Sequence, residues 1–259
     1  MKFRKSIVIF ISLLGCFMLN SKPAFAVSYD YLLLDSANAA YNKANYTRAI
    51  SFYQKFIGGG IESAQAYYNL GNCYYKTNDI PKAILFYEKA EKLIPGDPDL
   101  QFNLQLANQK IIDKIPGDAP LFIYSDWKRF ENKYSEKEWA LIFISIFCLS
   151  LLLFALYLIF SRILLKQLCF WSAFVVFFVS LFAFYIAHQQ YDTLNSHDTA
   201  IVMTPTVTVK GAPDEKATQL FVIHEGTKVS IVKMEGLYTE IRLSNGNQGW
   251  LNSTDISAI

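Results

Sequence analysis

The hydrophobic positions of this chain change pattern along its length. Continuous apolar runs occupy residues 6–19, 139–160 and 168–187, apolar residues at helical spacing recur within 28–115, and alternation with period two follows residue 198. A run of about 20 uncharged apolar residues can cross a hydrocarbon core as a helix, helical spacing indicates packed helices, and alternation indicates strands. We therefore expect a multi-part membrane protein with an α-helical solenoid, a two-helix transmembrane hairpin and a C-terminal all-β barrel.

The first apolar run predicts an export signal. It follows a basic start, spans about 14 residues and precedes Ala24-Phe25-Ala26, a typical cleavage site. We predict a signal peptide at 1–26; the alternative is a lipoprotein signal, Leu14-Gly15-Cys16, with Cys16 acylated. Removing 1–26 takes four basic and no acidic residues from a chain of net charge +2, which leaves about −2. This charge gives no support to nucleic-acid binding.

The other two runs predict a membrane hairpin with a defined orientation. Transmembrane helices at 139–160 and 168–187 flank a loop, 161–167, with two basic residues, whereas no Lys or Arg occurs from 188 to 208. By the positive-inside rule the loop is cytoplasmic, and an exported N-terminal part requires the same orientation. We expect a bacterial inner-membrane protein with two spans and with periplasmic N- and C-terminal domains.

A repeat with a period of 34 residues marks the helical part at 28–115. The segment AISFYQKF at 49–56 returns as AILFYEKA at 83–90, and this period is typical of helix-turn-helix units that stack on their neighbours. The second unit resembles the tetratricopeptide repeat (TPR) family at its packing positions, Tyr67, Leu70, Gly71, Tyr74, Ala83, Tyr87, Ala90 and Pro95. The first unit is more degenerate, and Asp99–Lys114 is expected to form a capping helix.

The TPR resemblance implies a groove that binds a protein partner. Carried over to this chain, its groove positions are Leu34, Asn38, Tyr41, Gln65, Tyr68, Asn72, Tyr75 and Lys76. The asparagines would hold peptide backbone amides and the tyrosines would supply contact area; the alternative is that the tyrosines only pack between helices. Because Lys76 is the single cation in this set, a clamp for a carboxyl terminus is incomplete.

Residues 116–138 join the repeats to the first span. Trp127, Phe130 and Tyr134 recur there at helical spacing beside Lys and Arg, as in a helix that lies on the bilayer surface. The alternative is a core helix of the repeat domain.

The last domain, 198–259, has short alternating segments separated by glycine turns, which predicts a small β-barrel. Its sequence resembles bacterial SH3 domains, which share a Gly-Trp pair, here Gly249 and Trp250. Leu237 stands where that family often has Trp. The resemblance implies a ligand surface that includes Tyr238 and Trp250.

No segment contains a recognisable catalytic motif. The three histidines, His188, His197 and His224, have no nucleophile signature, carboxylate cluster or metal-ligand spacing beside them. Cys73 is alone in its soluble domain, so we expect a packed thiol there. We predict no enzyme activity, no cofactor and no metal.

The order of these parts resembles BatE, the repeat-containing member of the Bacteroides aerotolerance (Bat) proteins. The segments DPDLQFNLQLANQKIIDKI (97–115) and LFVIHEGTKV (220–229) are the most similar. The resemblance implies work beside von Willebrand factor A-type membrane proteins and a MoxR-type AAA+ ATPase in envelope stress tolerance.

Two hypotheses for the function follow. In the first, the protein is a non-enzymatic scaffold whose TPR and SH3-like modules dock envelope proteins. In the second, the SH3-like domain binds peptidoglycan and the repeats stabilise it. A transmembrane sensor is disfavoured, because a seven-residue loop provides no cytoplasmic domain to receive a signal.

Overall fold

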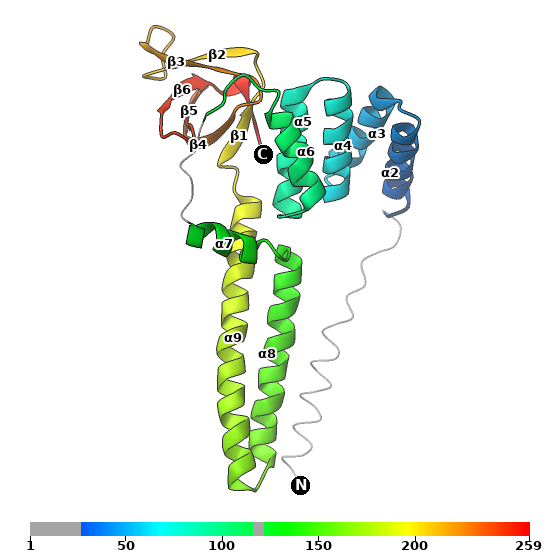
Figure 1. Ribbon diagram of the computed structural model, residues 1–259, viewed down its shortest axis with the longest axis vertical. Coiled ribbons are helices and arrows are strands. Elements are labelled where there is room, and N and C mark those ends of the chain that lie inside the picture. Colours follow the sequence, from blue (N-terminus) through cyan, green and yellow to red (C-terminus); the bar gives the residue numbers. More distant parts are fainter. Residues whose placement is uncertain (1–26, 116–121) are drawn as a thin grey trace.

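The computed structural model describes residues 27–115 and 122–259. The predicted signal peptide, 1–26, and the first part of the predicted linker, 116–121, lie outside the described residues. A group of helices, a long helical hairpin that projects away from them, and an antiparallel sheet beside them make up the molecule (Figure 1).

The helical part contains α2 (Val27–Asn42), α3 (Tyr46–Gly58), α4 (Ala64–Lys76), α5 (Ile80–Leu93) and α6 (Pro98–Asn108). Consecutive helices pack against each other, as the short loops between them require. Four of them begin directly after a capping side chain that accepts a hydrogen bond from the backbone N–H three residues on; these residues are Asn45, Ser63, Asp79 and Asp97. Each such cap stabilises a helix by about 1 kcal/mol.

Small residues let α4 and α5 approach closely. A Cβ added at Gly71 would lie 2.6 Å from ring atoms of Tyr87, and Ala66 and Ala83 are fully buried beside them. The 34-residue spacing of the sequence therefore repeats a packing arrangement. The expected capping helix is shorter than predicted, because α6 ends at Asn108 and the chain then turns toward the sheet.

Two apolar helices form the long hairpin: α8 (Glu136–Ile159, 24 residues) and α9 (Ile163–Asn195, 33 residues). They pack along each other, and both are long and apolar enough to cross a membrane. Helix α9 already begins at Ile163, so the connection is 160–162, shorter than the loop expected from the sequence. Its C-terminal part continues past the apolar stretch and reaches α5.

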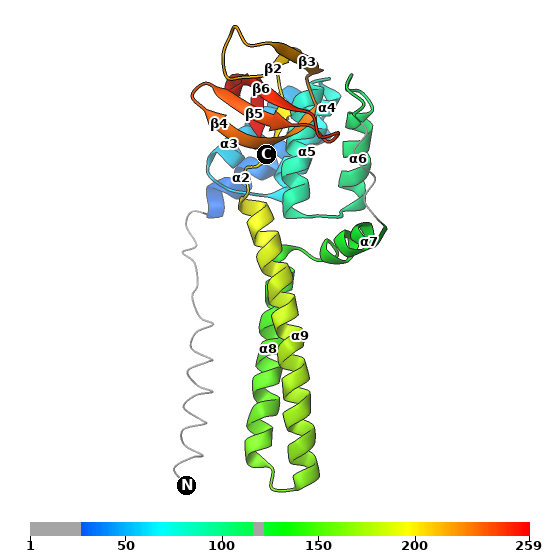
Figure 2. The ribbon, with the colours of Figure 1, turned by 90° about the vertical axis from the view of Figure 1, so that its left-hand side faces the viewer.

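A short helix, α7 (Phe122–Glu131), lies beneath the repeat helices and projects sideways from the head of the hairpin (Figure 2). The Trp127 ring lies 6.0 Å from that of Phe182 in α9, and the Phe130 and Tyr134 rings lie 5.6 and 5.5 Å from that of Trp139 in α8. The aromatic residues of the linker therefore pack on the hairpin rather than in the core of the repeats.

The C-terminal part is one antiparallel sheet of seven strands. The strands are β1 (Thr199–Val202), β2 (Thr206–Lys210), β3 (Gln219–His224), β4 (Lys228–Glu235), β5 (Tyr238–Arg242), β6 (Gln248–Asn252) and β7 (Ile256–Ala258), with a 3-10 turn, η1 (Ser253–Asp255), before the last. Their order is β3-β2-β6-β5-β4-β1-β7. The edge strands β3 and β7 do not pair with each other, so the sheet is open, whereas the sequence predicted a barrel.

Strand β1 joins the sheet to the repeats. Ala200 and Val202 point into the sheet's own core, whereas Ile201, between them, packs in the core of the repeat helices. This division follows from the alternation of side chains along a strand. Ile259, beyond β7, packs on the repeat side as well. The repeats and the sheet therefore share a hydrophobic contact.

Candidate partner-binding face

The residues expected to line a groove lie on the first helix of each unit, α2 and α4, and α6 follows as a third helix of the same kind. Gln65 and Lys76 are exposed, and the other six are partly buried: Leu34, Asn38, Tyr41, Tyr68, Asn72 and Tyr75. We call these eight residues, together with Phe102 and Lys110 of the α6 region, the docking face.

Two asparagines of the docking face hold the repeats together. Asn38 Oδ1 accepts hydrogen bonds from Tyr53 Oη (2.6 Å) and from Asn69 Nδ2 (3.3 Å). One period later, Asn72 Oδ1 accepts them from the next tyrosine, Tyr87 Oη (2.8 Å), and the next asparagine, Asn103 Nδ2 (3.1 Å). Each asparagine thus connects both helices of its own unit to the first helix of the following unit.

This network gives the asparagines a structural role in addition to the one predicted for them. Their carboxamide oxygens accept from buried tyrosines, since Tyr53 and Tyr87 are 0% and 1% exposed. A buried hydroxyl without a partner costs about 1–3 kcal/mol, so these acceptors are needed inside the fold. Asn38 and Asn72 therefore have a structural role, and their role in partner binding stays a prediction.

The tyrosines of the docking face both pack and remain partly accessible. Tyr68 accepts a hydrogen bond from Asn103 Nδ2 at 2.7 Å, and its ring lies 6.1 Å from that of Tyr87. Tyr41 meets the Tyr46 ring edge-on at 5.6 Å. Rings fixed in this way offer rigid, amphipathic contact area at a low entropic cost.

Sequence reasoning missed two residues of this face. Phe102 in α6 is 60% exposed, and the Lys110 ammonium lies 4.1 Å from the centroid of the Tyr75 ring. A signal for both was present, because they follow Tyr68 and Lys76 by one 34-residue period. The docking face therefore carries a second cation and an exposed aromatic ring.

The buried ionisable groups beneath this face are neutral at physiological pH. Burial raises the pKa of Tyr53 and of the Cys73 thiol to about 12, and it raises the pKa of Tyr87 further. The tyrosine hydroxyls stay protonated and can donate to the asparagines. Cys73, fully buried, is a packed thiol.

The residues predicted for a ligand surface on the sheet lie on adjacent strands. Tyr238 in β5 pairs with Asn252, and Trp250 in β6 pairs with Glu240, so the two aromatic residues are diagonal neighbours on one face. Trp250 is only 9% exposed, and the Lys233 ammonium lies 5.8 Å from its ring centroid. Tyr238 is partly exposed.

A polar contact between repeats and sheet involves a histidine that the sequence placed away from any carboxylate. Asp113 Oδ1 lies 2.9 Å from His224 Nδ1, and Asp113 Oδ2 accepts from the His224 backbone N–H (2.6 Å) and from Thr227 Oγ1 (2.8 Å). Nearby, Lys228 forms a 2.7 Å ion pair with Glu88 of α5. Within the described ranges, no three His, Cys, Asp or Glu residues are placed to hold a metal ion.

The comparison with known families finds one repeat unit in the helical part. Residues 64–97 match the tetratricopeptide repeat family, which covers α4, α5 and the turn after them. The second predicted repeat unit is thereby confirmed, and repeats of this family typically mediate protein–protein interaction. No curated protein matches the chain.

Proposed function

We propose that this protein is a non-enzymatic scaffold of the bacterial inner membrane that docks envelope proteins in the periplasm. The match to the tetratricopeptide repeat over residues 64–97 carries the proposal. The partly accessible tyrosines support it, since tyrosine is a common anchor in interfaces. The exposed Phe102 ring and the cations Lys76 and Lys110 add apolar area and positive charge to the same face.

The apolar hairpin supports anchoring in a membrane. Helices α8 and α9 display large apolar side chains over most of their length. Within the most apolar 18-residue stretch of each helix, only 6% and 22% of the residues, respectively, are buried. A lipid environment removes this surface from water. Arg162 and Lys166 lie at the tip of the hairpin and favour a cytoplasmic tip. The repeats and the sheet then both face the periplasm.

The more specific proposal is a Bat-type complex. The order of exported repeats, hairpin and a C-terminal sheet supports the resemblance to BatE, with the sheet as an SH3-like module. The partners would be von Willebrand factor A-type membrane proteins and, through them, a MoxR-type AAA+ ATPase system. The function would lie in envelope stress tolerance.

Co-purification from gently solubilised membranes, read by mass spectrometry, tests the scaffold. The test variant is Phe102→Ala with Lys76→Glu, because both side chains are exposed and neither belongs to the asparagine network. The matched control is Lys55→Glu, an exposed lysine in the last turn of α3. We expect envelope proteins to accompany the native chain and the control but not the test variant. An identical partner set for all three proteins would contradict docking on this face.

A second candidate function is binding of peptidoglycan by the sheet. The basis for it is the resemblance of this part to bacterial SH3 domains, and the sheet and its turns offer an accessible surface with exposed apolar residues: Leu220, Val222, Val232, Met234 and Leu237. The full-length chain would be sedimented with purified cell wall, with Leu237→Asp as the variant. Wall binding that is lost in this variant and kept in the docking-face variant would support the sheet as the primary module.

A further inference from the structure

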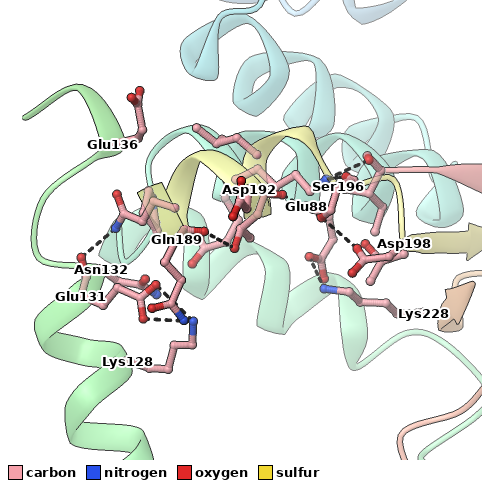
Figure 3. Close-up of a pocket in the computed structure, with 18 residues that line it drawn as sticks. Glu88, Lys128, Glu131, Asn132, Glu136, Gln189, Asp192, Ser196, Asp198 and Lys228 are labelled. Atoms are coloured by element: carbon pink, nitrogen blue, oxygen red, sulfur yellow. Dashed lines mark hydrogen bonds and ion pairs between the residues drawn. The ribbon is translucent and has the colours of Figure 1, made fainter. Parts of the chain in front are cut away.

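A cavity of about 570 Å³ lies where the repeats, the head of the hairpin and the sheet meet (Figure 3). Its walls come from the end of α5, from α7 and the start of α8, and from the last turns of α9 and the segment before β1. This volume is within the range of about 300–1,000 Å³ that is usual for small-molecule sites.

The cavity has an excess of negative charge. Among the described residues that line it, six are carboxylates and three are lysines. The lysines are already engaged: Lys228 pairs with Glu88 at 2.7 Å, Lys92 donates to the carbonyl of Ser196 at 2.6 Å, and Lys128 lies 3.1 Å from Glu131. A further cation would relieve the remaining repulsion.

Three oxygen atoms in this cavity accept no hydrogen bond from the described residues. They are Oε2 of Glu91, Oε2 of Glu131 and Oε1 of Gln190. Glu131 and Gln190 are 1% and 6% exposed, so both are more than nine-tenths buried. The other polar atom of each of these side chains forms a hydrogen bond that fixes its position.

The fixed positions can be followed from the hydrogen bonds. Gln190 Nε2 donates to the backbone oxygen of Glu131 (2.8 Å) and to that of Tyr134 (3.1 Å). These two bonds fix the amide so that Oε1 of Gln190 points away from both backbone oxygens. Glu91 Oε1 accepts from the Gly96 backbone N–H at 3.1 Å. Lys128 donates to Oε1 of Glu131 at 3.3 Å, and its ammonium lies 3.1 Å from Oε2, so this carboxylate is paired in charge although Oε2 has no well-directed donor.

Unpaired buried acceptors are costly and are rare in native structures. A ligand that satisfies several of them must bring more than one N–H or O–H donor, and the excess of carboxylates in the cavity favours a cationic ligand. A primary ammonium group has three N–H donors and a positive charge. A quaternary ammonium has the charge but no donor.

The position of the cavity indicates where this ammonium comes from. Trp139, at the start of the apolar α8, donates from Nε1 to the backbone oxygen of Glu131 at 2.9 Å, so the cavity borders the aromatic end of the apolar hairpin. Aromatic residues of this kind mark the headgroup level of a membrane. We propose that the cavity binds the ammonium of an aminophospholipid headgroup, with Glu131, Gln190 and Glu91 as its acceptors. This inference rests on the proposed membrane anchoring.

Short-chain lipids that dissolve as monomers test the site in the purified full-length chain. The readout is Tm in a non-ionic detergent, with dihexanoyl phosphatidylethanolamine as the probe and dihexanoyl phosphatidylcholine as the comparison. At ten times the dissociation constant we expect phosphatidylethanolamine to raise Tm by roughly 3–6 °C. Phosphatidylcholine, which lacks N–H donors, is expected to leave Tm unchanged. An equal shift with both lipids would overturn the proposal.

Two conservative variants locate the effect. Glu131→Gln and Glu91→Gln each remove a negative charge and keep the size of the side chain, so both are expected to lose the response to phosphatidylethanolamine. Glu215→Gln, an exposed carboxylate between β2 and β3, is the control and should respond like the native chain. An undiminished response in both cavity variants would refute the site, even if one of them folded poorly.

A basic segment of a protein partner is the competing occupant. Stabilisation of the native chain by a lysine peptide, without any effect of phosphatidylethanolamine, would overturn the lipid proposal in its favour. Extraction of membranes with alkaline carbonate tests the anchoring separately. Because binding of the short-chain probe lipids does not require a bilayer, failure of the anchoring and failure of the site give different results.

Discussion

The asparagine–tyrosine network gives a quantitative prediction about the repeats. Tyr87, 1% exposed, donates to Asn72 Oδ1 at 2.8 Å, and Asn103 donates to the same oxygen at 3.1 Å. Tyr87→Phe removes one donor and leaves Asn72 with the other. Asn72→Ala removes the acceptor of both donors and leaves a buried hydroxyl without a partner. The two substitutions remove the same hydrogen bond but leave different groups behind.

The expected magnitudes differ accordingly. Tyr87→Phe should cost the net value of one hydrogen bond, about 0.5–1.5 kcal/mol. Asn72→Ala should cost about 1–3 kcal/mol, which is the penalty for a buried unsatisfied group. In the double variant the orphaned hydroxyl is absent, so we expect less destabilisation than in Asn72→Ala alone. Such non-additivity is usual for residues in direct contact.

Amide hydrogen exchange of the full-length chain, read by mass spectrometry on peptides of α4 and α5, measures this local stability. The values above correspond to exchange about 2- to 13-fold faster for Tyr87→Phe and about 5- to 160-fold faster for Asn72→Ala. If Asn72→Ala left exchange in both helices unchanged while it abolished partner binding, Asn72 would be a contact residue without a structural role in the repeats.

Three further predictions concern packing, the contact between domains, and Cys73. Gly71→Ala should lower the free energy of unfolding by about 1–3 kcal/mol, because the added methyl group would collide with the buried Tyr87 ring. Gly58→Ala places its methyl group in open space and should be neutral or stabilise by up to about 1 kcal/mol. If the two substitutions shifted Tm by the same amount, the packing argument would be contradicted. Burial raises the pKa of Asp113, but hydrogen bonds from His224 outweigh it and the pKa is lowered overall. The contact between Asp113 and His224 should therefore be fully present above about pH 4 and be lost as the pH falls through the lower, folded-state pKa of Asp113. Proteolysis between repeats and sheet that stays equally slow from pH 6 down to about pH 2 would count against it. Because burial raises the pKa of Cys73 to about 12, its alkylation at pH 8 should be at least about 100-fold faster in denaturant than in the native chain, and equal rates would refute the packed thiol.

The repeat could be predicted from the sequence because its signals are local and periodic. Gly71, Ala83 and Tyr87 lie at fixed offsets within one 34-residue unit, and the unit matches its family. The same period pointed to Phe102 and Lys110, but only the hydrogen bonds of Asn103 show that α6 stands in the place of a third unit's first helix.

The contacts between the parts could not be predicted in this way. Asp113 and His224 are 111 positions apart, and Gln190 and the backbone of Glu131 are 59 apart. Neither pair has a periodic signal, because each forms only when separate elements fold and dock. The openness of the sheet was missed for a similar reason: alternation predicts strands, whereas strand order depends on which edges meet.

The docking of the parts bears directly on the scaffold hypothesis. A repeat joined to a membrane helix by a free linker would present a partner at variable height and orientation. Here Lys92 of α5 donates to the carbonyl of Ser196, directly after α9, and Ile201 of β1 packs in the core of the repeats. The docking face is therefore fixed relative to the apolar hairpin. If α8 and α9 are inserted in the membrane, a partner bound on α4 and α6 is held at a set distance from the bilayer. That restriction favours partners that are themselves anchored in the same membrane.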